Sequence, residues 1–146
     1  MKVNLGSGLK YLDGYVNVDM EKNVKCDIVC DITKGLPFRD FSVDEILLDN
    51  VLEHLDVDLV KLIVEVKRVL KPNGLLKIIS PNCFKWDHRI NFLFGKFKAG
   101  DGYHFNHKWL FKPSFLKGLL EYYGFEVNKV NDLFDRRVDL IARKRT

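Results

Sequence analysis

The chain of 146 residues lacks the features that mark membrane proteins and disulfide-rich proteins. No apolar run approaches the roughly 20 residues that a membrane-spanning helix needs, and Met1 leads into a short strand-like run rather than a signal-peptide core. The three cysteines are an odd number, which argues against a disulfide framework. We therefore expect a cytoplasmic protein that does not span a membrane.

Metal ligands at suitable spacing are also scarce. Cys26 and Cys30 are four residues apart and would face the same side of a strand, but a metal would need two further ligands. We interpret both as buried free thiols. The pair His104 and His107 lacks clear further ligands as well, so we expect no metal.

The sequence has no linker-like stretch, no internal repeat and no low-complexity segment. With 47% hydrophobic and 30% charged residues, its length suits one domain, residues 1–146, around a single core. The 24 Lys and Arg exceed the 20 Asp and Glu by four. This mild excess favours an anionic ligand, but it does not indicate nucleic acid.

The start of the chain carries the clearest ligand-binding pattern. A short apolar run ends in Gly6-Ser7-Gly8, where glycine allows a sharp turn and a close approach of the backbone to a ligand. Asp19 closes the next apolar run, and a carboxylate there can accept hydrogen bonds from two ribose hydroxyls. The pattern predicts a nucleoside site. The third glycine and the helix of a dinucleotide fingerprint are missing, which disfavours a nicotinamide-dependent oxidoreductase.

Strand-like and helical patterns alternate along the chain, which predicts a mostly parallel α/β sheet covered by helices. Asp56 is predicted to cap the first helix, and the sequence Lys-Pro-Asn-Gly at 71–74 to end it. Residues 9–14 are too few for a crossover helix of about a dozen residues, so we expect a loop or a single turn there. The predicted strands are 2–5, 15–18, 27–30, 45–48, 75–80, 125–130 and 138–142, and the predicted helices are 59–70 and 113–123.

Residues 82–112 break this periodicity and are rich in basic and aromatic side chains. They follow the fifth predicted strand, and connections after the carboxyl ends of parallel strands border the ligand crevice. We expect a lid-like insertion here. Its lysines and Arg89 suit an anionic acceptor such as a phosphorylated sugar or nucleotide. A solvated lid whose aromatic side chains pack on the core explains the composition equally well.

With three further motifs, the chain resembles class I S-adenosylmethionine-dependent methyltransferases, more narrowly the small-molecule, methyltransferase type 11-like kind. The further motifs are Asp31-Ile32, the segment 49–55 (DNVLEHL) and the turn 71–74. The resemblance covers residues 2–82 by motif and 113–143 by element order. It implies a Rossmann-like, mostly parallel seven-stranded α/β sheet with a reduced first crossover helix.

The resemblance also implies that S-adenosylmethionine is the cofactor. By position, the glycine turn lies under the methionine and ribose part, Asp19 holds the ribose hydroxyls, and Asp31 pairs with the adenine amino group. Asn4 stands near a position where the family has an acid, so one carboxylate near the sulfonium or amino group is missing. The implied cofactor-binding residues are Gly6, Ser7, Gly8, Asp19, Met20, Asp31, Ile32, Asp49, Asn50 and Val51.

Three histidines are candidates for removing a proton from a hydroxyl acceptor, because histidine titrates near neutral pH. His104 and His107 lie in the predicted insertion, and His54 lies after the fourth strand. A surface or packing role remains the alternative for His104 and His107, and a polar helix start is the alternative for His54.

We therefore expect an enzyme that transfers a methyl group to a small-molecule or glycan-like acceptor. The alternative is a non-catalytic S-adenosylmethionine-binding module that works with a partner protein. Methylation of nucleic-acid amino groups is disfavoured, because residues 49–52 lack the Asn/Asp-Pro-Pro-Tyr/Phe pattern of those enzymes. The acceptor and the oligomeric state stay open.

Overall fold

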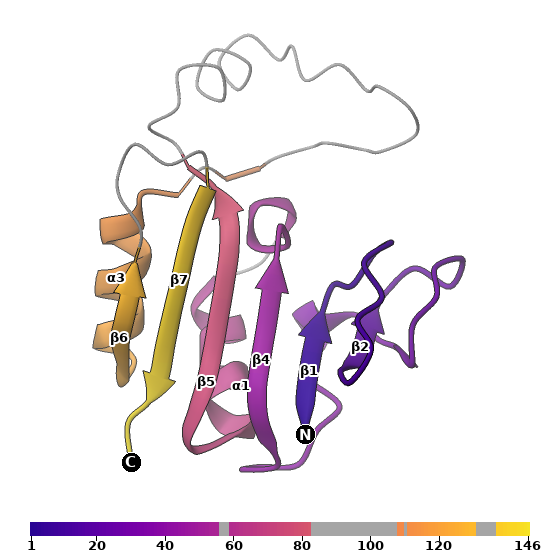
Figure 1. Ribbon diagram of the computed structural model, residues 1–146, viewed down its shortest axis with the longest axis horizontal. Helices are drawn as coiled ribbons and strands as arrows, with labels where there is room; N and C mark the ends of the chain where they lie inside the picture. Colours follow the sequence, from indigo (N-terminus) through magenta and orange to yellow (C-terminus); the bar gives the residue numbers. More distant parts are fainter. Residues whose placement is uncertain (56–58, 83–107, 110, 131–136) are drawn as a thin grey trace, which may run out of the picture.

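The computed structural model describes residues 1–55, 59–82, 108–109, 111–130 and 137–146. In this part of the chain, seven strands form one sheet in the order β3-β2-β1-β4-β5-β7-β6 (Figure 1). Neighbouring strands are parallel except where β7 pairs with β5 and β6. The strands are β1 (Lys2–Leu5), β2 (Val16–Asp19), β3 (Ile28–Val29), β4 (Val43–Asp49), β5 (Leu70–Pro81), β6 (Phe125–Val130) and β7 (Arg137–Lys144). The predicted α/β fold with a mostly parallel seven-stranded sheet is confirmed.

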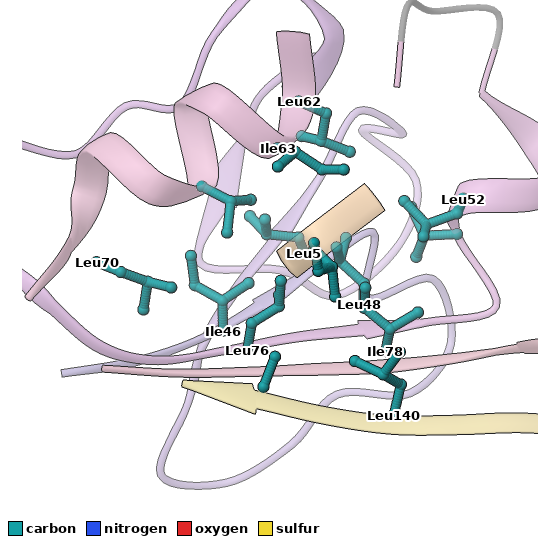
Figure 2. Close-up of a cluster of buried hydrophobic side chains, with 14 of the residues drawn as sticks. Leu5, Ile46, Leu48, Leu52, Leu62, Ile63, Leu70, Leu76, Ile78 and Leu140 are labelled. Carbon is teal, nitrogen blue, oxygen red and sulfur yellow. The ribbon is translucent and has the colours of Figure 1, made fainter. Parts of the chain in front are cut away.

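In the described part of the chain, two α-helices pack on this sheet, as their apolar spacing predicted. Helix α1 (Leu59–Val69) buries Leu62, Ile63 and Val66, which recur at helical spacing. Figure 2 shows Leu62 and Ile63 facing the side chains of the strands. Helix α3 (Pro113–Tyr122) begins with proline and buries Leu116 and Leu120. Gly124 follows it with a φ of 87°, a conformation that glycine adopts without strain. The predicted cap of α1, Asp56, lies outside the described residues.

Both helices lie on one face of the sheet, behind the strands in Figure 1. The hydrophobic core fills the space between these helices and the sheet, where Leu5, Ile46 and Ile78 are fully or almost fully buried. On the opposite face of β5, Lys77 and Ile79 are only half-buried. The described residues therefore cover this strand more completely on the face that packs against the helices.

No helix connects β1 to β2, which confirms the reduced first crossover. Two paired asparagines, Asn4 of β1 and Asn17 of β2, fix the connection instead. Asn17 is fully buried; its Oδ1 accepts from the backbone N of Leu12 at 2.9 Å, and its Nδ2 donates to the carbonyls of Leu12 and Tyr15, both at 3.0 Å. Asn4 Nδ2 donates to the carbonyl of Lys10 at 3.0 Å. The side chains of the two strands thus provide the hydrogen bonds that a helix would make within itself.

The turn predicted at 71–74 lies inside β5 rather than between a helix and a strand. Leu70 pairs with Val43 and Leu75 with Glu45, so four residues of β5 lie opposite a single residue of β4. Asn73 takes a φ of 61° within this bulge. A Cβ on Gly74 would lie 2.9 Å from the carbonyl oxygen of Lys71, which is why the bulge needs glycine.

Most of the predicted insertion at 82–112 lies outside the described residues. An isolated parallel bridge joins Asn82 to Phe111, so the two described ends of this segment meet beside β5. Among the helices of the described residues, none has the length and apolar character needed to cross a membrane.

Candidate functional site

The glycine turn follows β1 at the carboxyl edge of the sheet. Its backbone N–H groups at Gly6 and Ser7 both donate to the carbonyl of Val18, at 2.8 and 3.0 Å, which ties the turn to β2. Gly6 has a φ of 67°, and a Cβ there would lie 2.7 Å from Cγ2 of Val51. Gly8 has a φ of 50°, and a Cβ there would meet nothing within 4 Å. The turn therefore packs tightly on one side and presents bare backbone on the other.

Asp19, the last residue of β2, is held by this turn. The backbone N of Gly8 donates to Oδ2 at 2.7 Å, and the backbone N of Glu21 donates to Oδ1 at 2.9 Å. The residue is only 8% exposed. A carboxylate has about four acceptor positions, so each oxygen keeps one for a ligand. The carboxylate is thus fixed in orientation and can still accept hydrogen bonds.

Asp31 follows β3 and caps the 3₁₀ helix η1 (Ile32–Lys34). Its Oδ1 accepts from the hydroxyl and the backbone N of Thr33, at 2.6 and 3.1 Å. These hydrogen bonds, together with Lys34 at 3.1 Å from Oδ2, lower the pKa of Asp31 below its ordinary value. The side chain is therefore an ionised acceptor at neutral pH.

The glycine turn, Asp19 and Asp31 border one cavity of about 750 Å³, which we call the nucleoside cavity. Eight of the ten predicted cofactor-binding residues line it, and Ser7 and Asp49 do not. His54 lines it as well, while His104 and His107 lie outside the described residues. The lining residues are Gly6, Gly8, Leu9, Asp19, Met20, Glu21, Val24, Cys30, Asp31, Ile32, Thr33, Asn50, Val51, His54 and Leu55.

Several lining residues were missed by the sequence reasoning. Leu9 directly follows the glycine turn, so extending that motif by one residue would have found it. Leu55 ends the segment 49–55 but was not assigned to the cofactor. Cys30 was interpreted as a buried thiol, but it is partly exposed and lines the cavity. Its burial raises the pKa of its thiol, and the neighbouring Asp31 adds to this. No sequence signal pointed to Val24, which reaches the cavity from the loop before β3.

Charged groups gather where β4 ends beside the glycine turn. Lys10 Nζ lies 2.7 Å from Oδ2 of Asp49, and Oδ1 of Asp49 accepts from Nδ2 of Asn50 at 2.7 Å. Asn50 takes a φ of 55°, which ends the strand and turns the chain into the wall of the cavity. This ion pair joins the loop after β1 to the end of β4.

Glu53 lies behind this wall, in the 3₁₀ helix η2 (Leu52–His54), and is fully buried. Oε2 accepts from the hydroxyl of Ser80 at 3.2 Å, and Oε1 has no hydrogen-bond partner in the described part of the chain. Burial raises the pKa of this carboxyl to about 7. A buried carboxyl with one hydrogen bond is stabilised in its protonated form.

The backbone of η2 also holds the chain that returns from the predicted insertion. The carbonyl of Glu53 accepts from the backbone N of Lys108 at 2.7 Å and of Trp109 at 3.3 Å. The indole Nε1 of Trp109 donates to the carbonyl of Leu55 at 3.0 Å. The segment that carries His54 and Leu55 therefore has the nucleoside cavity on one side and the end of the insertion on the other.

A family model described as a methyltransferase domain matches residues 8–78, from the glycine turn to β5. Residues 8–78 of this chain are thus similar to a methyltransferase domain. An uncharacterized protein of Methanocaldococcus jannaschii is 36% identical over 72 residues, which make up 49% of this chain and 31% of that protein. The similar stretch thus spans about a third of the length of that relative.

Solved structures share the fold over nearly the whole chain. A SAM-dependent methyltransferase from Archaeoglobus fulgidus has a TM-score of 0.75 at 20% identity, and the match covers 98% of this chain and 85% of that one. A SAM-dependent methyltransferase from Thermotoga maritima, described as a "possible histamine N-methyltransferase", has a TM-score of 0.74 at 18% identity and covers 99% and 82%. The chain therefore has the class I methyltransferase fold.

S-adenosylmethionine is the methyl donor of methyltransferases of this kind, and the nucleoside cavity fits it in three respects. Its volume falls within the range of about 300 to 1,000 Å³ that small-molecule pockets occupy. The Asp19 carboxylate is oriented and has acceptor capacity left. The hydroxyl of Ser7, within the glycine turn, is buried without a hydrogen-bond partner in the described residues.

Proposed function

We propose that this chain is a methyltransferase that transfers a methyl group from S-adenosylmethionine to a small-molecule or glycan-like acceptor. The observation that carries the proposal is the Asp19 carboxylate at the wall of the nucleoside cavity, oriented by two backbone N–H groups. A ribose offers two neighbouring hydroxyl donors, and the two carboxylate oxygens can each accept one. Asp31 would accept from the adenine amino group, with Ile32 and Met20 against the ring.

The remaining residues position the reacting groups. S-adenosylmethionine supplies a methyl group that its sulfonium already activates, so positioning can provide most of the rate acceleration. Gly6 and Gly8 keep the backbone turn free of side chains beneath the ligand, and Asn50 and Val51 border it from the end of β4. We assign to His54, which lines the cavity, the role of accepting the proton of a hydroxyl acceptor.

We place the acceptor beside the turn that carries His54, where the basic segment returns to the sheet. Lys108 and Lys112 lie at the described end of the basic segment, and Lys108 contacts the turn that carries His54 through its backbone N. Their charge favours an anionic acceptor such as a phosphorylated sugar. A small amine is the competing acceptor class, as the description of the Thermotoga maritima neighbour suggests for that protein.

The experiment is to incubate the protein with S-adenosylmethionine and a panel of sugars, phosphorylated sugars, alcohols and small amines, and to measure S-adenosylhomocysteine formation. We expect product with a hydroxyl acceptor and a rate that falls by about 10² or more in His54→Gln. S-adenosylhomocysteine should bind this variant as it binds the parent protein. Tight cofactor binding without product from any acceptor, together with capture of one partner protein, would support the non-catalytic module instead.

A further inference from the structure

Trp109 is an exposed aromatic residue that is fixed against the wall of the nucleoside cavity. Its backbone N donates to the carbonyl of Glu53 at 3.3 Å, and its indole Nε1 donates to the carbonyl of Leu55 at 3.0 Å. Leu55 and its neighbour His54 line the cavity. Trp109 is therefore attached to the turn that carries the assigned proton acceptor.

About half of Trp109 stays accessible despite these contacts. Its exposed fraction is 52%, whereas Phe111, two residues further along the chain, is only 5% exposed. The one polar atom of the indole, Nε1, is bonded to Leu55, so the rest of the side chain offers an apolar aromatic surface. A single exposed aromatic side chain is common on protein surfaces. This one, however, is held by two hydrogen bonds, so a ligand that binds it does not have to order it first.

Basic residues flank Trp109 in the described part of the chain. Lys108 precedes it and donates its backbone N to the carbonyl of Glu53 at 2.7 Å, and Lys112 is the N-cap residue of α3. The sequence has no Asp or Glu from residue 102 to residue 120. The segment around Trp109 is therefore positively charged, which attracts anionic ligands.

An aromatic face can hold two kinds of polar small molecule. Because the face is electronegative, it attracts either the C–H groups of a sugar ring or an ammonium group. The lysines on either side of Trp109 separate these alternatives, since they repel a cation and attract a phosphate. The combination favours a phosphorylated sugar over a small amine.

We propose that Trp109, Lys108 and Lys112 form the subsite for a phosphorylated sugar acceptor. This inference rests on the proposed function. The sugar ring stacks on the indole face, and the lysine ammonium groups donate to the phosphate. The hydrogen bond to Leu55 holds the indole at a fixed place relative to the cavity wall, so a sugar bound there is positioned next to the methyl donor.

The test measures the affinity of pentose and hexose phosphates, and of the matching neutral sugars, for the protein saturated with S-adenosylhomocysteine. Nuclear magnetic resonance titration suits such weak ligands. Trp109→Leu should weaken the binding of both kinds of sugar about tenfold, because the stacking contact is lost. Lys112→Gln should weaken only the phosphorylated sugars, by about three- to fivefold, as expected for one exposed ion pair.

Trp109→Phe separates stacking from tethering. Phenylalanine keeps an aromatic face but cannot donate to the carbonyl of Leu55. This variant should therefore retain more of the sugar affinity than Trp109→Leu. Equal losses in the two variants would mean that Trp109 only holds the turn in place, and would overturn the stacking role.

Tyr122→Leu is the matched control, because Tyr122 is an exposed aromatic residue at the other end of α3. It should bind every sugar as the parent protein does. If S-adenosylhomocysteine binds but the phosphorylated sugars do not, or if small amines bind more tightly than these sugars, this inference fails and the proposed cofactor site stands. If S-adenosylhomocysteine itself does not bind, the proposed function fails and this inference fails with it.

Discussion

Glu53 gives the sharpest test of the structure, because its burial couples folding stability to pH. Its carboxyl has a pKa of about 7, whereas the ordinary value is 4.5. Between these values the folded chain keeps the proton and the unfolded chain loses it, so the free energy of unfolding falls as the pH rises. Above about pH 7 both states are ionised and this dependence ends.

The size of the effect follows from the interval between the two pKa values. About 2.5 pH units at 1.36 kcal/mol each correspond to about 3 kcal/mol of unfolding free energy lost between about pH 4.5 and pH 7. Glu53→Gln keeps the shape and can still accept from Ser80, but it does not titrate. Its unfolding free energy should therefore lack this decline, whatever its absolute value.

Urea unfolding of both proteins between pH 5 and pH 8 measures the difference in slope. Glu65→Gln is a matched control, because hydrogen bonds from Arg68 lower the pKa of Glu65 to about 2. The stability that Glu65 contributes is present above its ordinary value of 4.5 and is lost only as the pH falls toward 2, so this variant should keep the slope of the parent protein. Parallel curves for the parent protein and Glu53→Gln would refute the buried, protonated carboxyl.

Two further substitutions test the glycine turn and its acid. Asp19→Asn should weaken S-adenosylhomocysteine binding about 10- to 150-fold in calorimetry, because a lost charge-assisted hydrogen bond costs about 1.5 to 3 kcal/mol. Asp27→Asn is the control, because Asp27 also accepts from a backbone N–H but lies outside the nucleoside cavity. This control variant should keep the affinity of the parent protein. Gly6→Ala should lower the unfolding free energy measured in urea by about 1 to 3 kcal/mol, because the new Cβ would overlap Val51. Adding Val51→Ala should recover part of this loss. If the losses of the two substitutions simply add, this contact is contradicted.

Local patterns were sufficient to predict the elements of the sheet. The strand 2–5 has the predicted bounds, and the helix 113–123 differs from α3 by one residue. Both depend on short-range signals, namely an apolar run before glycine and a proline start with a glycine end. The cavity-lining positions of Asp19 and Asp31 were predictable for the same reason, since each residue is placed by the strand that precedes it.

Features that depend on contacts between distant segments were not predictable. The bulge at 71–74 was interpreted as a turn because its composition is that of a turn, and only the pairing with β4 shows that β5 continues through it. Asn17 gave no signal as the residue that orders the first connection, because its partners become neighbours only after β1 and β2 pair. Glu53 was included in a motif by its position, but its burial comes from β5 and from the returning chain at Lys108.

The central claim is that the nucleoside cavity binds an adenosine-containing methyl donor. Calorimetric titration of the protein with S-adenosylhomocysteine tests it most directly, because this ligand needs no acceptor and no turnover. The structure predicts saturable binding of one ligand per chain, weakened by Asp19→Asn and retained in Asp27→Asn. No binding at high micromolar ligand, with the protein folded, would contradict the assignment.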